Sequence, residues 1–407
     1  MIKEFKKSNC RLCKSKNIEE VYVFKKTPIG DDYRHVKIKH SFFDLKINLC
    51  KKCNFVQLSN VINPDRVYGE YLYITETSVG LVSHFENLVN DLFNKKILKR
   101  TSQVLEIGSN DGSLQKIIKK KCYFVVGVDP AVHLTTDEDL VTMKGLYDNK
   151  FSKKVENRFY KFDVVIANNV IANIDNLDTV FRGINNNLVE NGYFVMETFS
   201  LSKLLNNNLI DNIYHEHISY FTFKTISNFS KKYNLQLVDG SFQVVKGGSL
   251  RLIFKKQKKM FLNKKIKKLI SKEEKLINIK KNFNNLRKLN NENKNKLKNY
   301  LNKNNLKKII GFGASVGTTT LIYDFELTHR ISYIFDNEKK RHNMLLPGTN
   351  IKVKTPKKIG KDNVVLIFAW RYFGNILKKN KKFFPKGTTF IIPLPKFKII
   401  KIWKKHL

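Results

Sequence analysis

Two histidines, a glutamate and two tyrosines fall within ten consecutive positions near the middle of the chain. They belong to the run NIYHEHISYF at positions 212–221, which contains Tyr214, His215, Glu216 and His217. Imidazole, carboxyl and phenol groups are side chains that enzymes use to move protons, so the run is the candidate catalytic centre. Core packing is an alternative for a single histidine. A metal site is a poorer alternative because no third ligand with suitable spacing lies nearby.

Four of the five cysteines form two close pairs near the start of the chain. Each CxxC pair offers two thiolates, and two pairs make the ligand set of a closed tetrahedral Zn²⁺ site. Because no ligand position stays open to water, the metal is expected to be structural. Alternating apolar residues at 20–24 and 37–39 predict strands between the pairs. The expected zinc ligands are Cys10, Cys13, Cys50 and Cys53.

Short apolar strands then alternate with turns and helices, after an amphipathic helix expected at 79–98. The first strand leads into a glycine turn from Gly108 to Gly112, and the second strand ends in Asp129. This alternation predicts a doubly wound parallel sheet with its ligand at the carboxyl ends of the strands, where an acid such as Asp129 suits ribose hydroxyls. The expected strands cover residues 104–107, 123–128, 162–167 and 192–197.

A second glycine-rich unit begins at residue 308 and has the sequence KIIGFGASVGTTTL. A strand, a glycine turn and a hydroxyl-rich helix start make a cradle for a phosphate or a nucleotide, because backbone N–H groups converge there. Residues 331–337 and 364–370 are expected to be its further strands. A Lys- and Asn-rich segment at 255–308, with apolar residues at helical intervals, predicts a helical connector between the two units.

The totals of the chain limit its class. Its 407 residues suffice for two or three domains, and 76 Lys+Arg against 35 Asp+Glu give a formal charge of +41. That charge would attract nucleic acid, anionic lipid or phosphorylated small molecules. Because the lysines are scattered, solvated surface lysines are favoured over a nucleic-acid arm. No apolar stretch reaches the length of a membrane span and no signal peptide is evident, so we expect a cytoplasmic protein, and a monomer.

Three features in this order resemble the sugar C-methyltransferase family. They are the four-cysteine module, a sheet with the motifs EIGSNDGSL at 106–114 and YHEHISYF at 214–221, and a C-terminal glycine-loop domain with LPGT at 346–349, FAW at 368–370 and IPLP at 392–395. The resemblance implies an α/β protein with a zinc module at 1–75, a class I Rossmann-like methyltransferase domain at 76–254, the connector at 255–308 and a second Rossmann-like domain at 309–407.

The resemblance also implies a reaction and its residues. Family members transfer a methyl group from S-adenosylmethionine to C3 of a nucleotide-linked 4-keto-deoxysugar. His217 would be the base, Glu216 would hold the sugar or orient the base, and Tyr214 would line the site. The remaining implied catalytic residues are Tyr71, Tyr73 and Asn173. The implied cofactor ligands are Glu106, Gly108, Asn110, Asp111, Gly112, Asp129, Asn168 and Asn169. The implied nucleotide-sugar ligands are Gly311, Gly313, Ser315, Gly317, Thr318 and Thr319.

The chain departs from the family pattern in two places. Many members carry a histidine where Asn173 stands, and an amide cannot shuttle a proton near neutral pH. The family often has a basic residue followed by Gly-Asn where Gly317, Thr318 and Thr319 stand, so charge pairing with a sugar pyrophosphate must come from elsewhere. Two alternatives stay open: an RNA methyltransferase or other nucleic-acid-binding protein, and a sugar O-methyltransferase.

Overall fold

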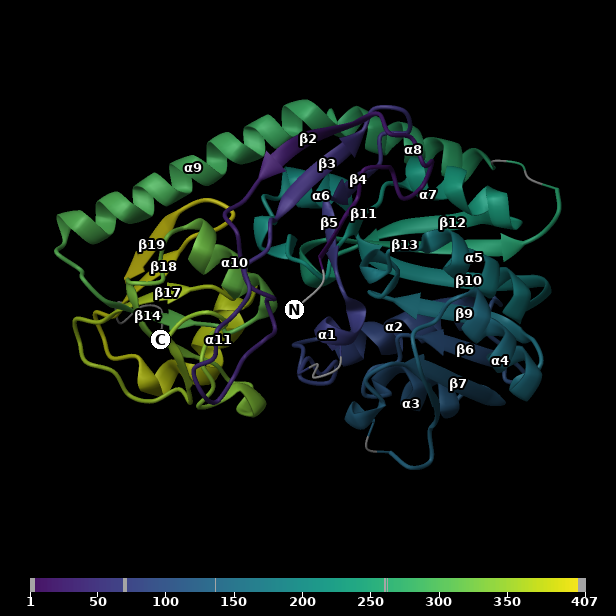
Figure 1. Ribbon diagram of the computed structural model, residues 1–407. Coiled ribbons are helices and arrows are strands. Elements are labelled where there is room, and N and C mark those ends of the chain that lie inside the picture. The colour runs from purple at the N-terminus through teal and green to yellow at the C-terminus, as the bar shows by residue number, and fades with distance from the viewer. Residues whose placement is uncertain (1–3, 69–71, 136, 260, 262, 402–407) are drawn as a thin grey trace.

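The computed structural model describes residues 4–68, 72–135, 137–259, 261 and 263–401. Two α/β domains lie side by side, and a small β domain lies between them at the top of the view in Figure 1. A long helix crosses the top from one α/β domain to the other. Within the described residues, no helix is long and apolar enough to cross a membrane.

The N-terminal module is a small antiparallel sheet. Its strands are β2 (Ile18–Val23), β3 (Lys46–Cys50), β4 (Val56–Leu58) and β11 (Ser219–Tyr220), and β1 (Glu4–Lys6) pairs with β5 (Asn60–Ile62) beside it. The fourth strand comes from the central run, because Ser219 pairs with Gln57 and Tyr220 with Val56. The strand expected at 37–39 is wrong: these residues are exposed and form part of a long loop between β2 and β3.

The central domain is a seven-stranded sheet in the order β12-β13-β10-β9-β6-β7-β8. The strands are β6 (Gln103–Ile107), β7 (Phe124–Asp129), β8 (Val141–Lys144), β9 (Phe162–Asn168), β10 (Leu188–Phe199), β12 (Leu235–Gln243) and β13 (Ser249–Lys256). The five from β6 to β10 are parallel, and β12 and β13 add an antiparallel edge. The strand order reverses at β6, so the crevice between β6 and β9 is where a ligand is expected.

Helices pack on both faces of this sheet. They are α2 (Leu81–Asn94), α3 (Ser113–Lys119), α4 (Asn149–Phe159), α5 (Leu177–Asn187), α6 (Leu201–Asn206) and α7 (Phe223–Ser230). The expected helix at 79–98 is α2, and it buries Leu81, Phe85 and Leu88 against the sheet, as their spacing of three and four residues requires. A short helix, α1 (Pro64–Tyr68), connects the N-terminal module to this domain.

The C-terminal domain is a second doubly wound sheet in the order β16-β15-β14-β17-β18-β19. Its strands are β14 (Ile309–Phe312), β15 (Ile331–Phe335), β16 (Lys352–Lys354), β17 (Val364–Ile367), β18 (Thr389–Ile392) and β19 (Lys398–Lys401), and its helices are α10 (Val316–Asp324) and α11 (Phe373–Asn380). The predicted connector forms α8 (Lys264–Leu276) and the long helix α9 (Ile279–Lys303).

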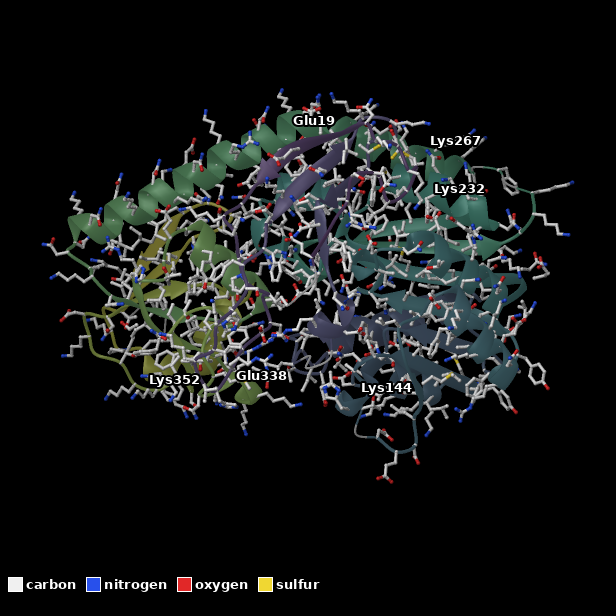
Figure 2. The ribbon with its side chains drawn as sticks, in the orientation of Figure 1. Glu19, Lys144, Lys232, Lys267, Glu338 and Lys352 are labelled. Atoms are coloured by element: carbon white, nitrogen blue, oxygen red, sulfur yellow. The ribbon has the colours of Figure 1, made fainter. Side chains whose placement is uncertain are left out.

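The basic residues are spread over the surface. Lys144, Lys267 and Lys352 are exposed, belong to β8, α8 and β16, and lie at separate edges of the molecule in Figure 2. Lysines placed this way keep a protein solvated but do not form one continuous groove for a nucleic-acid backbone.

Candidate active site

The four cysteines converge in the N-terminal module as their spacing predicts. Their Sγ atoms all lie within 4.8 Å of one another, with Cys10 and Cys53 at 3.6 Å and Cys13 and Cys50 at 3.5 Å. A tetrahedron with Zn–S bonds of about 2.3 Å has edges of about 3.8 Å, so the cluster has the size of a zinc site. All four ligands are thiols, which leaves no position for substrate and fits a structural metal.

The four-cysteine site is connected to the loops around the candidate catalytic run. Arg11, which lies between two of the cysteines, donates from Nη1 to the Leu58 carbonyl (2.8 Å) and from Nε to Asp175 Oδ1 (3.0 Å). The Leu58 N–H donates in turn to the carbonyl of Ile218 (3.0 Å). The end of the central run, at Ile218, is thus connected through Leu58 and Arg11 to Asp175 in the loop that follows β9, and Arg11 itself lies between two of the zinc-site cysteines.

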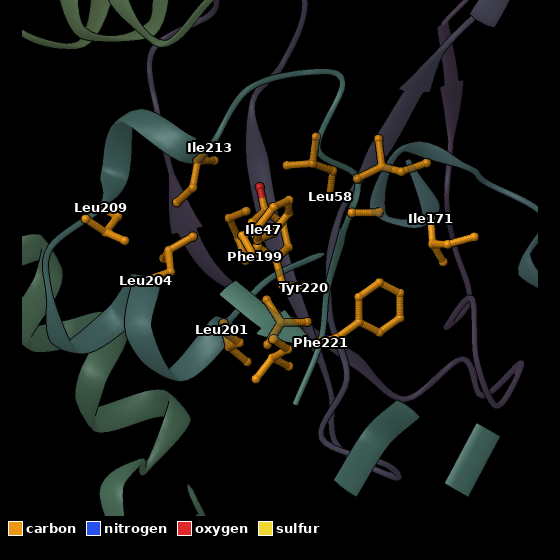
Figure 3. Close-up of a cluster of buried hydrophobic side chains, with 14 of the residues drawn as sticks. Ile47, Leu58, Ile171, Phe199, Leu201, Leu204, Leu209, Ile213, Tyr220 and Phe221 are labelled. Carbon is orange, nitrogen blue, oxygen red and sulfur yellow. The ribbon is translucent and has the colours of Figure 1, made fainter. Parts of the chain in front are cut away.

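Apolar packing joins the same parts. In Figure 3, Ile47 and Leu58 of the N-terminal sheet lie with Ile171, Phe199 and Tyr220 of the central domain in one cluster. All five side chains are at most 5% exposed. Because this core is shared, the N-terminal module and the catalytic run are held in one fixed arrangement.

The glycine turn after β6 takes the backbone shape that its glycines permit. Gly108 and Gly112 have φ of 77° and 78°, and a Cβ on Gly108 would come within 2.8 Å of Val170. Asn110 also has positive φ (51°), and its N–H donates to Asp129 Oδ2 (2.9 Å). The turn therefore lies tightly between the ends of β6, β7 and β9, as close approach of a ligand to the backbone requires.

Three acids gather at this turn. Burial and the charges of Asp129 and Asp111 raise the pKa of Glu106 well above its ordinary value. Burial likewise raises the pKa of Asp129, whose carboxylate accepts from the N–H groups of Asn110 and Ala131. Among the described residues, Oε2 of Glu106 and both side-chain atoms of Asn168 are buried without a hydrogen-bond partner. Such orphaned polar atoms fit a site that binds a polar ligand such as S-adenosylmethionine.

A segment from Tyr73 to Thr77 closes over the turn. Thr75 donates from N–H (3.1 Å) and Oγ1 (3.0 Å) to Asn110 Oδ1, and the Glu76 N–H donates to Asp111 Oδ2 (2.8 Å). At its other end Lys246 Nζ donates to the Tyr73 hydroxyl (3.3 Å), and Tyr73 lies close enough to Tyr214 to act on the pKa of that phenol. Asn110 and Asp111 thus hold the segment that connects the turn to the catalytic run. Tyr71 lies outside the described residues.

His217 is held as a neutral imidazole with a defined orientation. Its Nδ1 lies 2.8 Å from the Asn212 carbonyl, which can only accept, so Nδ1 carries the proton and Nε2 has the lone pair. The Tyr214 hydroxyl lies 2.8 Å from Nε2 and the two rings are 4.0 Å apart. Burial lowers the pKa of His217 to about 3, with a smaller contribution from Lys246. Nε2 and the Tyr214 hydroxyl therefore form a hydrogen-bonded pair.

His215, in contrast, points away from this pair. Its Nε2 contacts Thr27 of the N-terminal module, 3.0 Å from Oγ1 and 3.3 Å from the carbonyl, and its ring packs edge-on against Phe43. His215 is therefore a core histidine with satisfied hydrogen bonds, and a metal site formed by both histidines is not present in this arrangement.

Glu216 is a buried acid without a partner. It is 4% exposed, and neither carboxyl oxygen has a hydrogen-bond partner among the described residues. Burial, with a smaller contribution from the charge of Asp31, raises its pKa to about 8. Its charge helps to raise the pKa of both Tyr214 and Tyr68, so the three side chains are neighbours. At neutral pH Glu216 is a protonated carboxyl group, which can donate a hydrogen bond.

Asn173 and Asn169 lie beside this group at the end of β9. The Asn173 side chain is a hydrogen-bonding neighbour of Tyr68, while its Oδ1 is buried without a partner. Asn169 has positive φ (56°) and donates its N–H to the Glu197 carbonyl (2.8 Å), so it shapes the loop. Tyr68, whose pKa is raised by burial and by the charges of Glu216 and Asp129, thus connects the described catalytic residues to the glycine turn.

The six C-terminal residues expected to bind a nucleotide sugar are engaged in packing. Thr318 Oγ1 donates to the Gly313 carbonyl (2.7 Å), and Thr319 Oγ1 donates to the Gly30 carbonyl (2.9 Å). A Cβ on Gly317 would come within 2.2 Å of the Asp211 carbonyl oxygen, and one on Gly311 within 2.8 Å of Phe368. Ser315 and Thr318 cap α10. The start of α10 is covered by other domains, so a phosphate cradle there stays a prediction that the packing does not favour.

The structure adds residues that the sequence did not single out. Asp211 accepts from Trp370 Nε1 (3.1 Å) and from Arg371 Nη1 (2.9 Å), and Arg371 Nη2 also donates to the Asn212 side chain (3.1 Å). The C-terminal domain therefore holds the backbone that orients His217. Tyr68 was also missed as a site residue. Its place beside Glu216 depends on the return of the N-terminal module, for which local sequence carries no signal.

Three family models match successive parts of the chain. A zinc binding domain matches residues 10–68, a methyltransferase domain matches 83–239, and the C-methyltransferase C-terminal domain matches 244–395. The C-methyltransferase NovU of Streptomyces niveus is 24% identical over 405 residues, which is 96% of each chain.

Solved structures similar to the chain cover only part of it. An S-adenosylmethionine-dependent methyltransferase from Archaeoglobus fulgidus has 16% identity and a TM-score of 0.35, over 42% of this chain and 94% of that one. One from Anabaena variabilis has 12% identity and a TM-score of 0.34, over 42% and 84%.

The switch-point crevice, its glycine turn and its acids, together with the match over 83–239, define an S-adenosylmethionine-dependent methyltransferase with a class I, Rossmann-like domain. The zinc-binding domain and the C-terminal match then place the chain more narrowly. Together the three matches indicate an S-adenosylmethionine-dependent C-methyltransferase similar to NovU, as the resemblance implied, with S-adenosylmethionine as cofactor and zinc in the four-cysteine site.

Proposed function

We propose that the chain methylates the carbon beside the ketone of a nucleotide-linked 4-keto-deoxysugar, with C3 as the acceptor. The observation that carries this proposal is the presence of an oriented, neutral His217 next to Glu216, whose carboxyl group is buried and has no hydrogen-bond partner among the described residues. Methylation of carbon needs a base to remove a weakly acidic proton and a donor to stabilise the enolate oxygen. Methylation of a sugar hydroxyl forms no enolate, so it would need no hydrogen-bond donor for an enolate oxygen.

The roles follow from the atoms. His217 accepts a proton at Nε2, the only ring nitrogen with a lone pair, and the Tyr214 hydroxyl donates to that lone pair. The proton therefore travels by way of Tyr214: its hydroxyl gives its proton to Nε2 while its oxygen takes the proton from the sugar carbon, which leaves the enolate and an imidazolium. As negative charge develops on the substrate, an imidazolium beside it becomes more favourable, which offsets the low pKa of the buried ring. S-adenosylmethionine supplies an electrophilic methyl group when bound.

Glu216 supplies the complementary group. As a neutral acid it can donate to the ketone oxygen and strengthen that bond as the oxygen becomes an enolate. Asn173 Oδ1, also buried and partnerless, offers an acceptor for a neighbouring sugar hydroxyl. An amide at this position serves in binding, since it cannot move a proton near neutral pH.

The test combines mass spectrometry and NMR on the full chain with S-adenosylmethionine and a panel of dTDP-, GDP-, UDP- and CDP-linked 4-keto-6-deoxysugars. We expect one product heavier by a methyl group, with that group on carbon, and loss of product in His217→Asn. His215→Asn is the matched control, because that imidazole faces Thr27 rather than the site. A methyl group on oxygen, or methylation of bulk RNA without any sugar product, would contradict the proposal.

A further inference from the structure

A lysine beside the candidate active site has a backbone shape that favours glycine. Lys246 lies in the turn of the hairpin between β12 and β13 and has a φ of 52° and a ψ of 26°. The next two residues, Gly247 and Gly248, also have positive φ values, of 87° and 138°. A glycine would form this turn at lower cost, so the turn itself gives no reason for a lysine side chain.

The turn is held in place from two sides. On one side, the Gly248 carbonyl accepts from the Ser200 N–H at the start of α6 (3.1 Å). On the other, a Cβ on Gly247 would come within 3.1 Å of Cδ of Arg371, which belongs to the C-terminal domain. The Lys246 side chain therefore begins at a point that both domains define.

The backbone of Lys246 contacts the loop that orients His217. Its carbonyl accepts from Nδ2 of Asn212 (3.3 Å), and the Asn212 carbonyl accepts in turn from His217 Nδ1 (2.8 Å). The ammonium group is also near enough to contribute to the low pKa of His217. Lys246 is thus a neighbour of the candidate base through both its backbone and its charge.

The side chain of Lys246 extends to the segment that covers the cofactor turn. Its Nζ donates to the Tyr73 hydroxyl (3.3 Å) and lies 5.1 Å from the centre of the Tyr73 ring. Ser78 Oγ donates to the same hydroxyl (2.9 Å), and the Tyr73 carbonyl accepts from Asn110 Nδ2 (3.2 Å). An ammonium group that hydrogen-bonds to an aromatic side chain and also faces its ring restricts where that ring can lie.

We propose that Lys246 is a positioning residue for methyl transfer, which connects the segment over the cofactor turn, through Tyr73, to the loop that orients His217. The part that concerns the cofactor depends only on the contact with Tyr73. The part that concerns His217 rests on the proposed function, in which that histidine accepts the proton. Because one residue holds both segments, the methyl donor and the base keep a constant separation, as methyl transfer to a newly formed enolate requires.

The test makes use of the backbone shape at position 246. Glycine adopts positive φ readily, so Lys246→Gly removes the ammonium group and keeps the turn and its carbonyl contact with Asn212. Lys96→Gly is the matched control, because Lys96 is exposed, has a φ of 55° and follows the end of α2. Lys246→Arg keeps the positive charge.

The first measurement is calorimetric titration of the zinc-loaded full chain with S-adenosylhomocysteine, which needs no methyl acceptor. Lys246→Gly should bind it about tenfold more weakly than the wild type, as expected when a hydrogen bond to a charged group is lost. Lys96→Gly should bind like the wild type, and Lys246→Arg should recover part of the affinity. In a Tyr73→Phe background the loss caused by Lys246→Gly should shrink to at most about threefold, because the hydroxyl that it contacts is already gone.

The second measurement is the rate of methyl transfer to the keto-sugar at saturating S-adenosylmethionine. Lys246→Gly should lower kcat about tenfold with little change in the KM of the sugar, because the base and the methyl donor are no longer held together.

Four results overturn the inference. They are unchanged S-adenosylhomocysteine affinity in Lys246→Gly, an equal loss in Lys96→Gly, a loss that stays tenfold in the Tyr73→Phe background, and a Lys246→Arg variant that binds no better than Lys246→Gly. The third result would show that the ammonium group acts on something other than Tyr73. A wild-type kcat in Lys246→Gly would overturn the connection to His217.

The two proposals can fail separately. If Lys246→Gly loses affinity as expected but the wild type methylates no keto-sugar on carbon, the proposed reaction is wrong and the role of the Lys246–Tyr73 contact stands. If a keto-sugar is methylated on carbon while affinity and kcat are unchanged in Lys246→Gly, the role of Lys246 is wrong and the reaction stands.

Discussion

Replacing Glu216 by glutamine should change how the stability of the protein depends on pH. The folded chain keeps the Glu216 proton up to a pKa of about 8, whereas the unfolded chain releases it near the ordinary 4.5. Because the unfolded state binds fewer protons between these two values, the free energy of unfolding of the wild type falls as pH rises from 5 to 8. Below pH 4.5 the contribution is fully present.

The size of the effect follows from the same two values. A separation of about 3.5 pKa units corresponds to at most about 5 kcal/mol at 1.36 kcal/mol per unit. Partial relaxation around a charged Glu216 reduces this, and we expect about 2–4 kcal/mol. In Glu216→Gln this contribution is absent, so the variant should gain that amount relative to the wild type between pH 5 and pH 8.

The assay is urea unfolding of both proteins at pH 5, 6, 7 and 8, with the exposed Glu138→Gln as a matched control. Curves of stability against pH that run parallel for wild type and Glu216→Gln would refute the reasoning, because they would show that Glu216 is already ionised in the folded chain. Activity gives an independent reading. The wild type should lose kcat above pH 8 as Glu216 ionises, whereas residual activity of Glu216→Gln, which still donates through its amide, should not.

Three further predictions concern the rest of the site. Burial lowers the pKa of His215 to about 4 and that of His217 to about 3, below the ordinary 6.5. The free energy of unfolding is therefore highest above pH 6.5 and falls as pH falls, by about 2 kcal/mol per histidine at pH 5. In urea unfolding, His217→Asn should lose the part of this pH dependence that His217 causes. Arg371→Lys cannot keep contacts to both Asp211 and Asn212, so kcat should fall about tenfold with little change in KM; equal kcat in Arg371→Lys and Arg158→Lys would contradict this. Cys13→Ser should lose zinc by metal analysis, melt at a lower temperature and lose kcat, because Arg11 no longer positions the loop at Asp175; a zinc-free variant with wild-type kcat would disprove that link.

Local sequence was sufficient for the elements of the central sheet. The expected strands at 104–107, 123–128 and 162–167 are β6, β7 and β9 to within two residues, because buried parallel strands are continuous apolar runs. The segment 37–39 alternates apolar and charged residues but is not a strand, since strand formation also needs a partner within reach. The edge strands β8, β16 and β19 were missed because they are short and partly exposed.

Residue types and spacing also determined much of the chemistry. Two CxxC pairs supply the four thiolates of a closed zinc site. The turn after β6 requires glycine at positions 108 and 112, because both residues have positive φ values. A histidine beside a glutamate indicated proton transfer; residue types and spacing alone could not tell which histidine, and the family resemblance implied His217. His215 and His217 differ in role only because one faces Thr27 and the other faces Tyr214.

What only the tertiary structure decided is how the three domains share one site. Burial, with a smaller contribution from the charge of Asp31 in the N-terminal module, raises the pKa of Glu216 to about 8, and His217 is oriented by a loop that Arg371 holds from the C-terminal domain. The start of α10 has the sequence of a phosphate cradle but is covered by Gly30 and Asp211. Sequence determines which groups a chain can offer, because that depends on local chemistry; burial and contacts between domains determine their pKa values and their access to ligand, because these depend on residues hundreds of positions apart.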